Sequence, residues 1–249
     1  MSAIAIEQVY KTYPGVTPVQ ALDSIDLQIE AGEFVALLGP SGCGKSTLLN
    51  LIAGFEKVSS GTLLVNGKGV TKPGPDRGVV FQEAALFPWL NVWENVVFGP
   101  KLAGLSKSEY EPRAKEMLEI TGLSAFVDHL PVQLSGGMRQ RVGIARVLTL
   151  SPEVLLMDEP FGALDAQTRL TMQELLLSVW GRLRTTVVFV THDIDEAILL
   201  ADTIYVMSAR PGRINQRITV PIERPRTIEH TTTKEFNELK RDILKHIRH

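Results

Sequence analysis

The sequence predicts an α/β protein with a mostly parallel sheet, and three observations lead to this prediction. Short apolar runs typical of buried strands alternate with helical stretches, as in a parallel sheet that helices cover on both faces. One such strand runs directly into a glycine-rich loop and a helix, over residues 34–53. Residues 3–10 and 21–29 instead alternate apolar and polar side chains, which is typical of half-buried antiparallel strands.

The first third of the chain is predicted to contain more strands than helices. The expected strands are 3–10, 21–29, 34–38, 61–65 and 78–82, with a helix over 45–53. Loops are expected at 11–18 and 72–76, and Asn66-Gly67 is a turn dipeptide.

A glycine-rich loop joins the strand at 34–38 to the helix at 45–53, and it fits the phosphate-binding pattern GxxxxGK[ST]. Glycines let the backbone point successive N–H groups into a concavity that suits phosphate oxygens, and a helix N-terminus favours anions. Lys45 adds a positive charge for the β- and γ-phosphates, and the Ser46 hydroxyl is the expected Mg²⁺ ligand. The predicted nucleotide-binding residues of this loop are Gly39, Pro40, Ser41, Gly42, Cys43, Gly44, Lys45, Ser46 and Thr47.

The middle of the chain, roughly residues 83–134, is predicted to be all-helical after an irregular stretch at 83–90. The clearest helix covers 107–120, where Ser106 and Glu109 match a capping box. We therefore expect a helical subdomain over roughly 83–150. It would interrupt an α/β domain over 1–220, and a linker and a basic helix would follow over 221–249.

The later chain returns to alternating strands and helices. Strands are expected at 154–157, 186–190 and 203–207, and helices from about 138 to 150, from 166 to a stop at Gly181, and up to 201. In parallel sheets, ligands bind at the carboxyl ends of the strands. The phosphate-binding loop, Gln82, Asp158 and His192 all follow such ends, so they are predicted to converge although they lie far apart in sequence.

These polar residues suit nucleotide hydrolysis. Asp158 is placed to hold Mg²⁺ directly or through water, and Glu159 to polarise an attacking water. A neutral His192 imidazole could hydrogen-bond the γ-phosphate or that water, and the Gln82 amide could contact Mg²⁺ or water. Taken alone, each residue also fits a solvated loop or a structural role.

A second candidate anion site lies at the start of a later helix. A serine and two glycines there would present N–H groups to an anion. One γ-phosphate does not need two such sites from one chain, so the natural solution is a head-to-tail dimer in which this site meets the partner's nucleotide. An ordinary serine N-cap is the alternative, and a P-loop kinase would leave the segment unexplained. The segment comprises Leu134, Ser135, Gly136, Gly137 and Met138.

Together these motifs resemble the ATP-binding cassette (ABC) ATPases over essentially the whole chain to about Met207. The resemblance implies a P-loop NTPase with a RecA-like mixed sheet core, an N-terminal antiparallel β subdomain and an inserted helical subdomain. It also implies two cassettes that sandwich two ATP molecules, with Tyr13 stacked on adenine, Glu159 as catalytic base and Asp165 crossing the dimer interface. Met138 stands where the family usually has Gln, and Gly162 where Ser is common. These departures bear on the rate of hydrolysis rather than on its presence.

Four segments are similar to the nitrate, sulfonate and taurine importers: residues 86–90, 158–165, 191–196 and 208–213. This similarity implies an ATPase subunit that is peripheral on the cytoplasmic face of the inner membrane and uses ATP and Mg²⁺. Its partners would be transmembrane permease subunits, a second ATPase subunit and, indirectly, an extracytoplasmic solute-binding protein. A groove near residues 82–89 would dock a permease helix, although core packing of Phe87 and Trp89 explains these aromatics equally well. A soluble ABC ATPase with a regulatory or assembly role is the alternative function.

The composition of the chain limits the kinds of partner that we expect. A net charge of −2 and a pI of about 6.2 give no reason to expect nucleic acid. Cys43 is the only cysteine, so no intrachain disulfide is possible. We expect no signal peptide, and no apolar run approaches the ~20 residues that span a bilayer. A basic helix from a capping box at Thr232 and Glu235 to His249 is expected to be plainly solvated rather than regulatory or membrane-bound.

Overall fold

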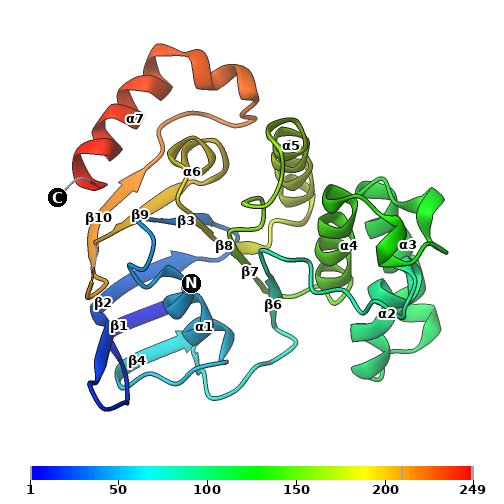
Figure 1. Cartoon of the computed structure of the whole chain (residues 1–249), viewed down its shortest axis with the longest axis horizontal. Coiled ribbons are helices and arrows are strands. Elements are labelled where there is room, and N and C mark those ends of the chain that lie inside the picture. Colours follow the sequence, from blue (N-terminus) through cyan, green and yellow to red (C-terminus); the bar gives the residue numbers. More distant parts are fainter. Residues whose placement is uncertain (1, 209, 248–249) are drawn as a thin grey trace. The chain divides into compact units, whose positions relative to one another are not determined.

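The structure is a computed structural model that describes residues 2–208 and 210–247. It divides the chain into two compact units (Figure 1). Unit 1 combines the two ends of the chain, Met1–Gly74 and Arg184–His249, and unit 2 is the intervening Pro75–Leu183. The boundaries expected from the sequence for the helical subdomain and for the 1–220 domain stay predictions.

Unit 1 contains an antiparallel sheet in the strand order β2-β1-β4-β5. These strands are β1 (Ser2–Tyr13), β2 (Val19–Glu30), β4 (Ser60–Val65) and β5 (Lys68–Gly69). The predicted loop at 11–18 is too long, because β1 continues to Tyr13 through irregular pairings with β2. The predicted turn at Asn66-Gly67 is confirmed, since both residues have positive φ, 49° and 73°.

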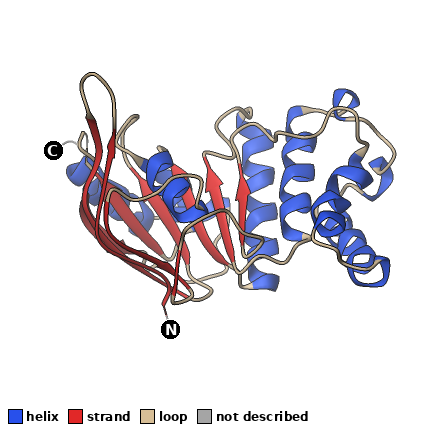
Figure 2. Ribbon diagram, turned by 90° about the horizontal axis from the view of Figure 1, so that it is seen from below, coloured by secondary structure: helices blue, strands red, loops and turns tan. Residues whose placement is uncertain are grey.

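A second set of strands in unit 1 is parallel and fully buried, and Figure 2 shows these strands in red. The central strand β3 (Phe34–Leu38) pairs in parallel with β8 (Thr186–Thr191) on one side and with β9 (Thr203–Met207) on the other. An outer strand that the sequence did not predict, β10 (Ile214–Thr219), pairs antiparallel with β9. Two helices of this unit are α1 (Lys45–Ala53) and α6 (Ile194–Leu200).

The C-terminal segment of unit 1 packs on α6. A short 3₁₀ helix (Ile228–Thr232) precedes α7 (Lys234–Ile247). The prediction of a plainly solvated helix is wrong, because Phe236 and Ile243 are buried, 1% and 0% exposed. The predicted cap is also displaced: Thr233, not Thr232, accepts a hydrogen bond at its Oγ1 from the Phe236 N–H (3.4 Å). The predicted end at His249 lies outside the described residues.

Unit 2 contains the helices of the middle stretch and one strand pair. The strands β6 (Arg77–Val80) and β7 (Val154–Asp158) are parallel. The helices are α2 (Val92–Leu102), α3 (Lys107–Ile120), α4 (Gly136–Leu148) and α5 (Ala166–Leu183). The predicted bounds of α3 and its capping box are confirmed. The predicted stop at Gly181 is wrong, because α5 continues to Leu183.

Candidate active site

The glycine-rich loop of unit 1 has the backbone that phosphate binding requires. Gly42 and Gly44 adopt left-handed conformations, with φ of 75° and 96°. A side chain at Gly44 would be strained by this φ, and its Cβ would also lie 2.6 Å from Leu22 Cδ2 on β2. Alternation of right- and left-handed residues turns successive N–H groups to one side of the loop and forms an anion-binding nest. The loop ends at the first residue of α1, Lys45, so the helix N-terminus adds its partial positive charge.

Lys45 is held at this loop. Its side chain is buried, and its ammonium donates hydrogen bonds to the carbonyl oxygens of Gly39 (2.8 Å) and Pro40 (3.1 Å). Ser46 follows on the exposed side of the first turn of α1, and Thr47 is half-buried. A lysine ammonium and an exposed hydroxyl therefore stand together at the start of α1.

Neighbouring strands bring His192 to the same edge of the parallel sheet. Leu38, the last residue of β3, is paired with Thr191, the last residue of β8. His192 is the next residue and is exposed. Asp193 then caps α6, because its carboxylate accepts hydrogen bonds from the N–H groups of Asp195 (2.8 Å) and Glu196 (3.2 Å). Unit 1 thus places an imidazole beside the strand that leads into the phosphate-binding loop.

Tyr13 is the last residue of β1. Lys11, two residues earlier, pairs with Leu22, which touches the loop at Gly44. The Lys11 ammonium lies 4.7 Å from the centre of the Tyr13 ring and covers one ring face. Stacking on a base would therefore use the opposite face of the ring.

Unit 2 brings Gln82 to the turn that carries Glu159. Asp158 ends β7, and Glu159 follows with a φ of 44°, a conformation that few residues other than glycine adopt. The turn closes when the Gly162 N–H donates to the Glu159 carbonyl oxygen (3.0 Å). A Cβ at Gly162 would lie 3.0 Å from Gln82 Nε2, so the glycine leaves room for the amide of Gln82. Gln82 lies two residues beyond the end of β6, whereas the sequence predicted it as the last strand residue.

The segment Leu134–Met138 lies beside the loop that contains Asp165. Ser135 is the N-cap of α4, because its Oγ accepts from the Met138 N–H (3.2 Å). A Cβ at Gly137 would lie 2.5 Å from Thr168 Cγ2 in the first turn of α5. The two helix N-termini therefore approach each other so closely that only glycine fits at this position. The N-cap alternative for Ser135 is confirmed, and it does not exclude a second role in anion binding.

Asp165 is exposed and caps α5. Its carboxylate accepts hydrogen bonds from the Thr168 hydroxyl (2.6 Å) and the Thr168 N–H (3.0 Å). These two bonds hold the pKa of Asp165 below its ordinary value, so the carboxylate is ionised at neutral pH.

The irregular stretch 83–90 is held by two side chains that the sequence did not single out. Asn95 is fully buried and exchanges hydrogen bonds with the backbone of Phe87. Arg146 donates to the carbonyl oxygens of Ala84 and Ala85 (both 3.0 Å) and lies over the Phe87 ring at 5.7 Å. Core packing therefore accounts for part of Phe87, but not for Trp89, which is 72% exposed.

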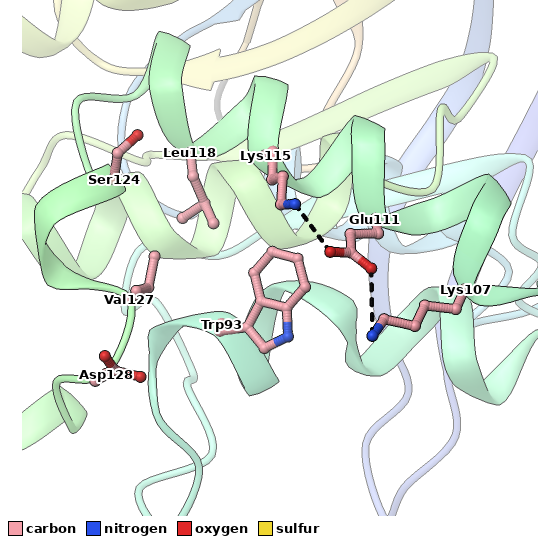
Figure 3. A pocket seen from close by; sticks show the side chains of 8 residues that line it. All are labelled: Trp93, Lys107, Glu111, Lys115, Leu118, Ser124, Val127 and Asp128. Carbon is pink, nitrogen blue, oxygen red and sulfur yellow. Dashed lines mark ion pairs between the residues drawn. The ribbon is translucent and has the colours of Figure 1, made fainter.

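Two hollows lie on unit 2. A groove of about 380 Å³ is lined by residues of the 82–86 segment, by the first turns of α4 and by Ala163 and Leu164. A second pocket, of about 420 Å³, lies on α2 and α3 (Figure 3). In it Glu111 pairs with Lys115 (2.9 Å) and Lys107 (3.6 Å), beside Trp93. Only the first hollow includes residues predicted for the site, Gln82 and Gly136.

The predicted site residues thus fall into two groups. Unit 1 carries Tyr13, the phosphate-binding loop and His192, and unit 2 carries Gln82, Asp158, Glu159, Asp165 and the segment 134–138. Within each unit the expected residues are brought together. That the two groups meet stays a prediction.

Comparison with known proteins gives the family. The model of the family described as ABC transporter matches residues 22–162. The nitrate import ATP-binding protein NrtD of Synechocystis is 52% identical over 202 residues, which cover 81% of this chain and 76% of that protein. The taurine import ATP-binding protein TauB of Rhizobium johnstonii is 49% identical and covers 90% and 88%. The aliphatic sulfonates import ATP-binding protein SsuB of Bacillus thuringiensis is 45% identical over 248 residues, 99% and 96% of the two chains.

Solved structures agree with this result. A dimeric post-hydrolysis state of an ATP-binding cassette bound to ADP and Pi has a TM-score of 0.76 and 34% identity, and covers 88% of this chain and all of that one. The fold class predicted from the sequence is therefore confirmed. Within the described residues, no helix combines the length and the apolar character needed to cross a bilayer. The phosphate-binding loop, the strand-end carboxylates and this likeness over nearly the whole chain agree: the chain belongs to the ABC transporter family and is an ATP-binding cassette ATPase.

Proposed function

We propose that the chain is the ATP-hydrolysing subunit of an importer for a small oxyanion or organosulfonate, such as nitrate, taurine or an alkanesulfonate. The observation that carries the proposal is the match to an aliphatic sulfonates import ATP-binding protein over 99% of this chain and 96% of that one. The taurine relative covers 90% and 88% of the two chains, and the nitrate relative covers 81% and 76% at a higher identity of 52%. Because the nucleotide subunit does not contact the solute in such a system, the three solutes stay candidates of equal standing.

The hydrolytic step is assigned to three side chains. Glu159 accepts a proton from the attacking water, and the strained φ of 44° supports this role because unusual backbone conformations cluster at active sites. His192 hydrogen-bonds the γ-phosphate, and Gln82 orients the water. The phosphate-binding loop and Lys45 hold the phosphates in place, so that catalysis depends on positioning and charge stabilisation.

Three residues are assigned to Mg²⁺: Ser46, Gln82 and Asp158. Their hydroxyl, amide and carboxylate oxygens are the hard ligands that Mg²⁺ prefers. The Ser46 hydroxyl is exposed at the start of α1, and Asp158 is half-exposed at the end of β7, so both are accessible to an ion. When bound, Mg²⁺ neutralises charge on the phosphates.

A second copy of the chain would complete each nucleotide site. Ser135 caps α4 and stands beside the Asp165 loop, so N–H groups of the α4 N-terminus and an ionised carboxylate occupy one surface of unit 2. We assign Leu134 to Met138 to the γ-phosphate of the partner's ATP and Asp165 to the dimer interface. ATP binding then closes the dimer, and hydrolysis reopens it.

Permease subunits would dock on unit 2 at the groove near residues 82–89 and at the aromatic side chains that follow it in the chain. Trp89 is 72% exposed, and the rings of Trp89 and Phe98 lie 5.7 Å and 4.5 Å from that of Phe87. Aromatic side chains with large exposed area are common anchors of protein interfaces. This position would place the ATPase on the cytoplasmic face of the membrane, with a solute-binding protein acting on the other side.

The test is uptake of labelled taurine, an alkanesulfonate and nitrate by source cells that carry Glu159→Gln on the chromosome. A matched control is Glu174→Gln, which removes the same charge from an exposed position on α5. We expect loss of one solute only in Glu159→Gln and normal uptake in the control. Unchanged uptake of all three solutes in Glu159→Gln would refute the importer assignment for these solutes, and the ATPase assignment would stand.

A further inference from the structure

Between β9 and β10, residues 210–213 form a turn that packs directly on the phosphate-binding loop. The Gly212 N–H donates to the Ala21 carbonyl oxygen (2.9 Å), and the Gly212 carbonyl oxygen accepts from the Asp23 N–H (2.9 Å). A Cβ at Gly212 would overlap the carbonyl oxygen of Cys43, which belongs to the loop. The turn is therefore fixed against both β2 and the phosphate-binding loop.

Sheet register places this turn at the nucleotide edge of unit 1. Leu38 of β3 is paired with Val206 of β9 in parallel, so both strands end at the same edge. A Cβ at Gly39 would lie 2.8 Å from the carbonyl oxygen of Met207, the last residue of β9. The chain that leaves β9 thus starts beside the chain that leaves β3, at the edge where parallel sheets bind ligands.

One cation of the turn faces the loop. A Cβ at Gly42 would lie 3.0 Å from Arg210 Nη2, 3.4 Å from Nε and 3.6 Å from Cζ, so the guanidinium lies against the open side of this glycine. Arg210 is exposed, and among the described residues no carboxylate pairs with it. Arg213 of the same turn differs in this respect, because its guanidinium pairs with Asp23.

We propose that Arg210 is a second cationic ligand of the nucleotide phosphates, in addition to Lys45. A guanidinium presents several N–H donors in a planar fork that matches the oxygens of a phosphate. Its uncompensated charge next to the anion-binding nest is unfavourable in the absence of an anion and becomes favourable when phosphate binds. Gly42 supplies the φ of 75° that the loop adopts there, and the guanidinium lies in the space beside it.

A cation at this position would act differently on ATP and on ADP during the reaction cycle. ATP carries one more negative charge than ADP, so a cation beside the phosphates stabilises the ATP complex more than the ADP complex. Arg210 would therefore sharpen the preference for ATP and weaken product binding. Because the side chain is exposed, its contribution should fall as salt rises.

The experiment is equilibrium titration of the full chain with ATP and with ADP at low and high salt. Mg²⁺ is left out so that ATP is not hydrolysed during the titration. The variants are Arg210→Ala, Arg210→Lys and the control Arg213→Ala, which removes the same charge from the same turn. We expect Arg210→Ala to raise the Kd for ATP about tenfold at low salt, the size of one charge-assisted hydrogen bond. The loss should be smaller for ADP and smaller at high salt, and Arg210→Lys should retain part of the affinity.

Two results would overturn the proposal. One is an ATP affinity of Arg210→Ala equal to that of the wild type. The other is an equal loss in Arg213→Ala, which would mean that the turn acts by supporting the loop. Circular dichroism of each variant tests whether it is folded. If Arg210→Ala does not fold, Arg210→Lys, which keeps the charge, becomes the test variant, and its ATP affinity is compared with that of the wild type.

Discussion

A single methyl group added at Gly137 tests the packing of the segment assigned to the partner's nucleotide. A Cβ at Gly137 would lie 2.5 Å from Thr168 Cγ2, whereas the nearest atoms to a Cβ at Gly136 are 3.9 Å away. Gly137→Ala therefore introduces a clash between α4 and α5. Gly136→Ala adds the same methyl group one residue earlier without a clash, and it is the matched control.

The loss in free energy of unfolding expected for Gly137→Ala follows from these distances. Carbon atoms in contact lie about 3.5–4.0 Å apart, so the new methyl group overlaps Thr168 by about 1 Å. Thr168 resists turning away, because it is β-branched and its hydroxyl donates to Asp165 (2.6 Å). Overpacking of this kind costs about 1–3 kcal/mol. The gain in helix propensity from glycine to alanine, about 1 kcal/mol, is shared by both variants. Gly137→Ala should thus be less stable than Gly136→Ala by about 1–3 kcal/mol.

The assay is urea unfolding of the full chain, followed by tryptophan fluorescence. All three tryptophans, Trp89, Trp93 and Trp180, lie in unit 2, so the signal reports this unit alone. A second variant tests the cause: Thr168→Ser removes Cγ2 and keeps the hydroxyl that bonds Asp165. Combined with Gly137→Ala, it should recover most of the lost free energy of unfolding.

Unfolding of Gly137→Ala and Gly136→Ala at the same urea concentration would show that the methyl group at Gly137 causes no clash between α4 and α5. A failure of Thr168→Ser to rescue Gly137→Ala would also contradict the prediction, because the clash would then lie elsewhere. A coupling energy of at least about 0.5 kcal/mol between the two positions is the expected outcome of the double-mutant cycle.

Three further predictions concern unit 1. Lys45→Ala should lose most of its affinity for ATP in nucleotide titrations, since it removes the ammonium held at the loop; an affinity unchanged from the wild type would contradict the site. Tyr13→Ala should weaken ATP binding by about 1–3 kcal/mol if the ring stacks on adenine, and equal affinity would argue against stacking. Arg226→Met should lower the free energy of unfolding by at least about 2 kcal/mol, because Arg226 is 6% exposed and donates to the carbonyl oxygens of Ile198, Ala201 and Ile222. Far-UV circular dichroism during unfolding measures this loss, and wild-type stability would show that the three carbonyls find other partners.

Arg226, Arg224 and Lys240 hold the C-terminal segment against α6. Burial lowers the pKa of Arg226 to about 10, which still leaves it charged at neutral pH. Its guanidinium and that of Arg224 satisfy carbonyl oxygens at the C-terminus of α6, where cations are favoured. Lys240 of α7 pairs with Asp195 at the other end of α6 (2.7 Å). Thus α6, which follows His192, is held at both ends by the C-terminal segment.

Much of the fold was predictable because local signals agreed. The bounds of β3, α1, α3 and β9 follow the sequence prediction to the residue. Glycines flank α1 at both ends, Gly39 follows β3, and Ser106 caps α3. Errors arose where the local signal was weak. β10 was missed because most of its side chains are exposed, so it lacks an apolar run. β1 was predicted too short because register shifts in its pairing with β2 disturb its alternation.

The candidate site also contains some features that the sequence predicts and others that it does not. The phosphate-binding loop, the strand-end carboxylates and the segment 134–138 were predicted from residue types and spacing alone, and their roles stay predictions. Backbone conformation and distant contacts are invisible in a pattern. The positive φ of Glu159, the place that Gly162 leaves for Gln82, and Arg210 lying on Gly42 needed the structure.

The most direct test of the account is the mass of the Glu159→Gln protein in solution, measured by light scattering with and without ATP. We predict a monomer without nucleotide, a dimer with ATP, and steady-state hydrolysis reduced nearly to zero. Adding Ser135→Arg should abolish the dimer while ATP still binds, because we propose that this residue contacts the partner's nucleotide. Normal hydrolysis by Glu159→Gln, or an ATP-dependent dimer that tolerates Ser135→Arg, would contradict the assigned base and the shared site.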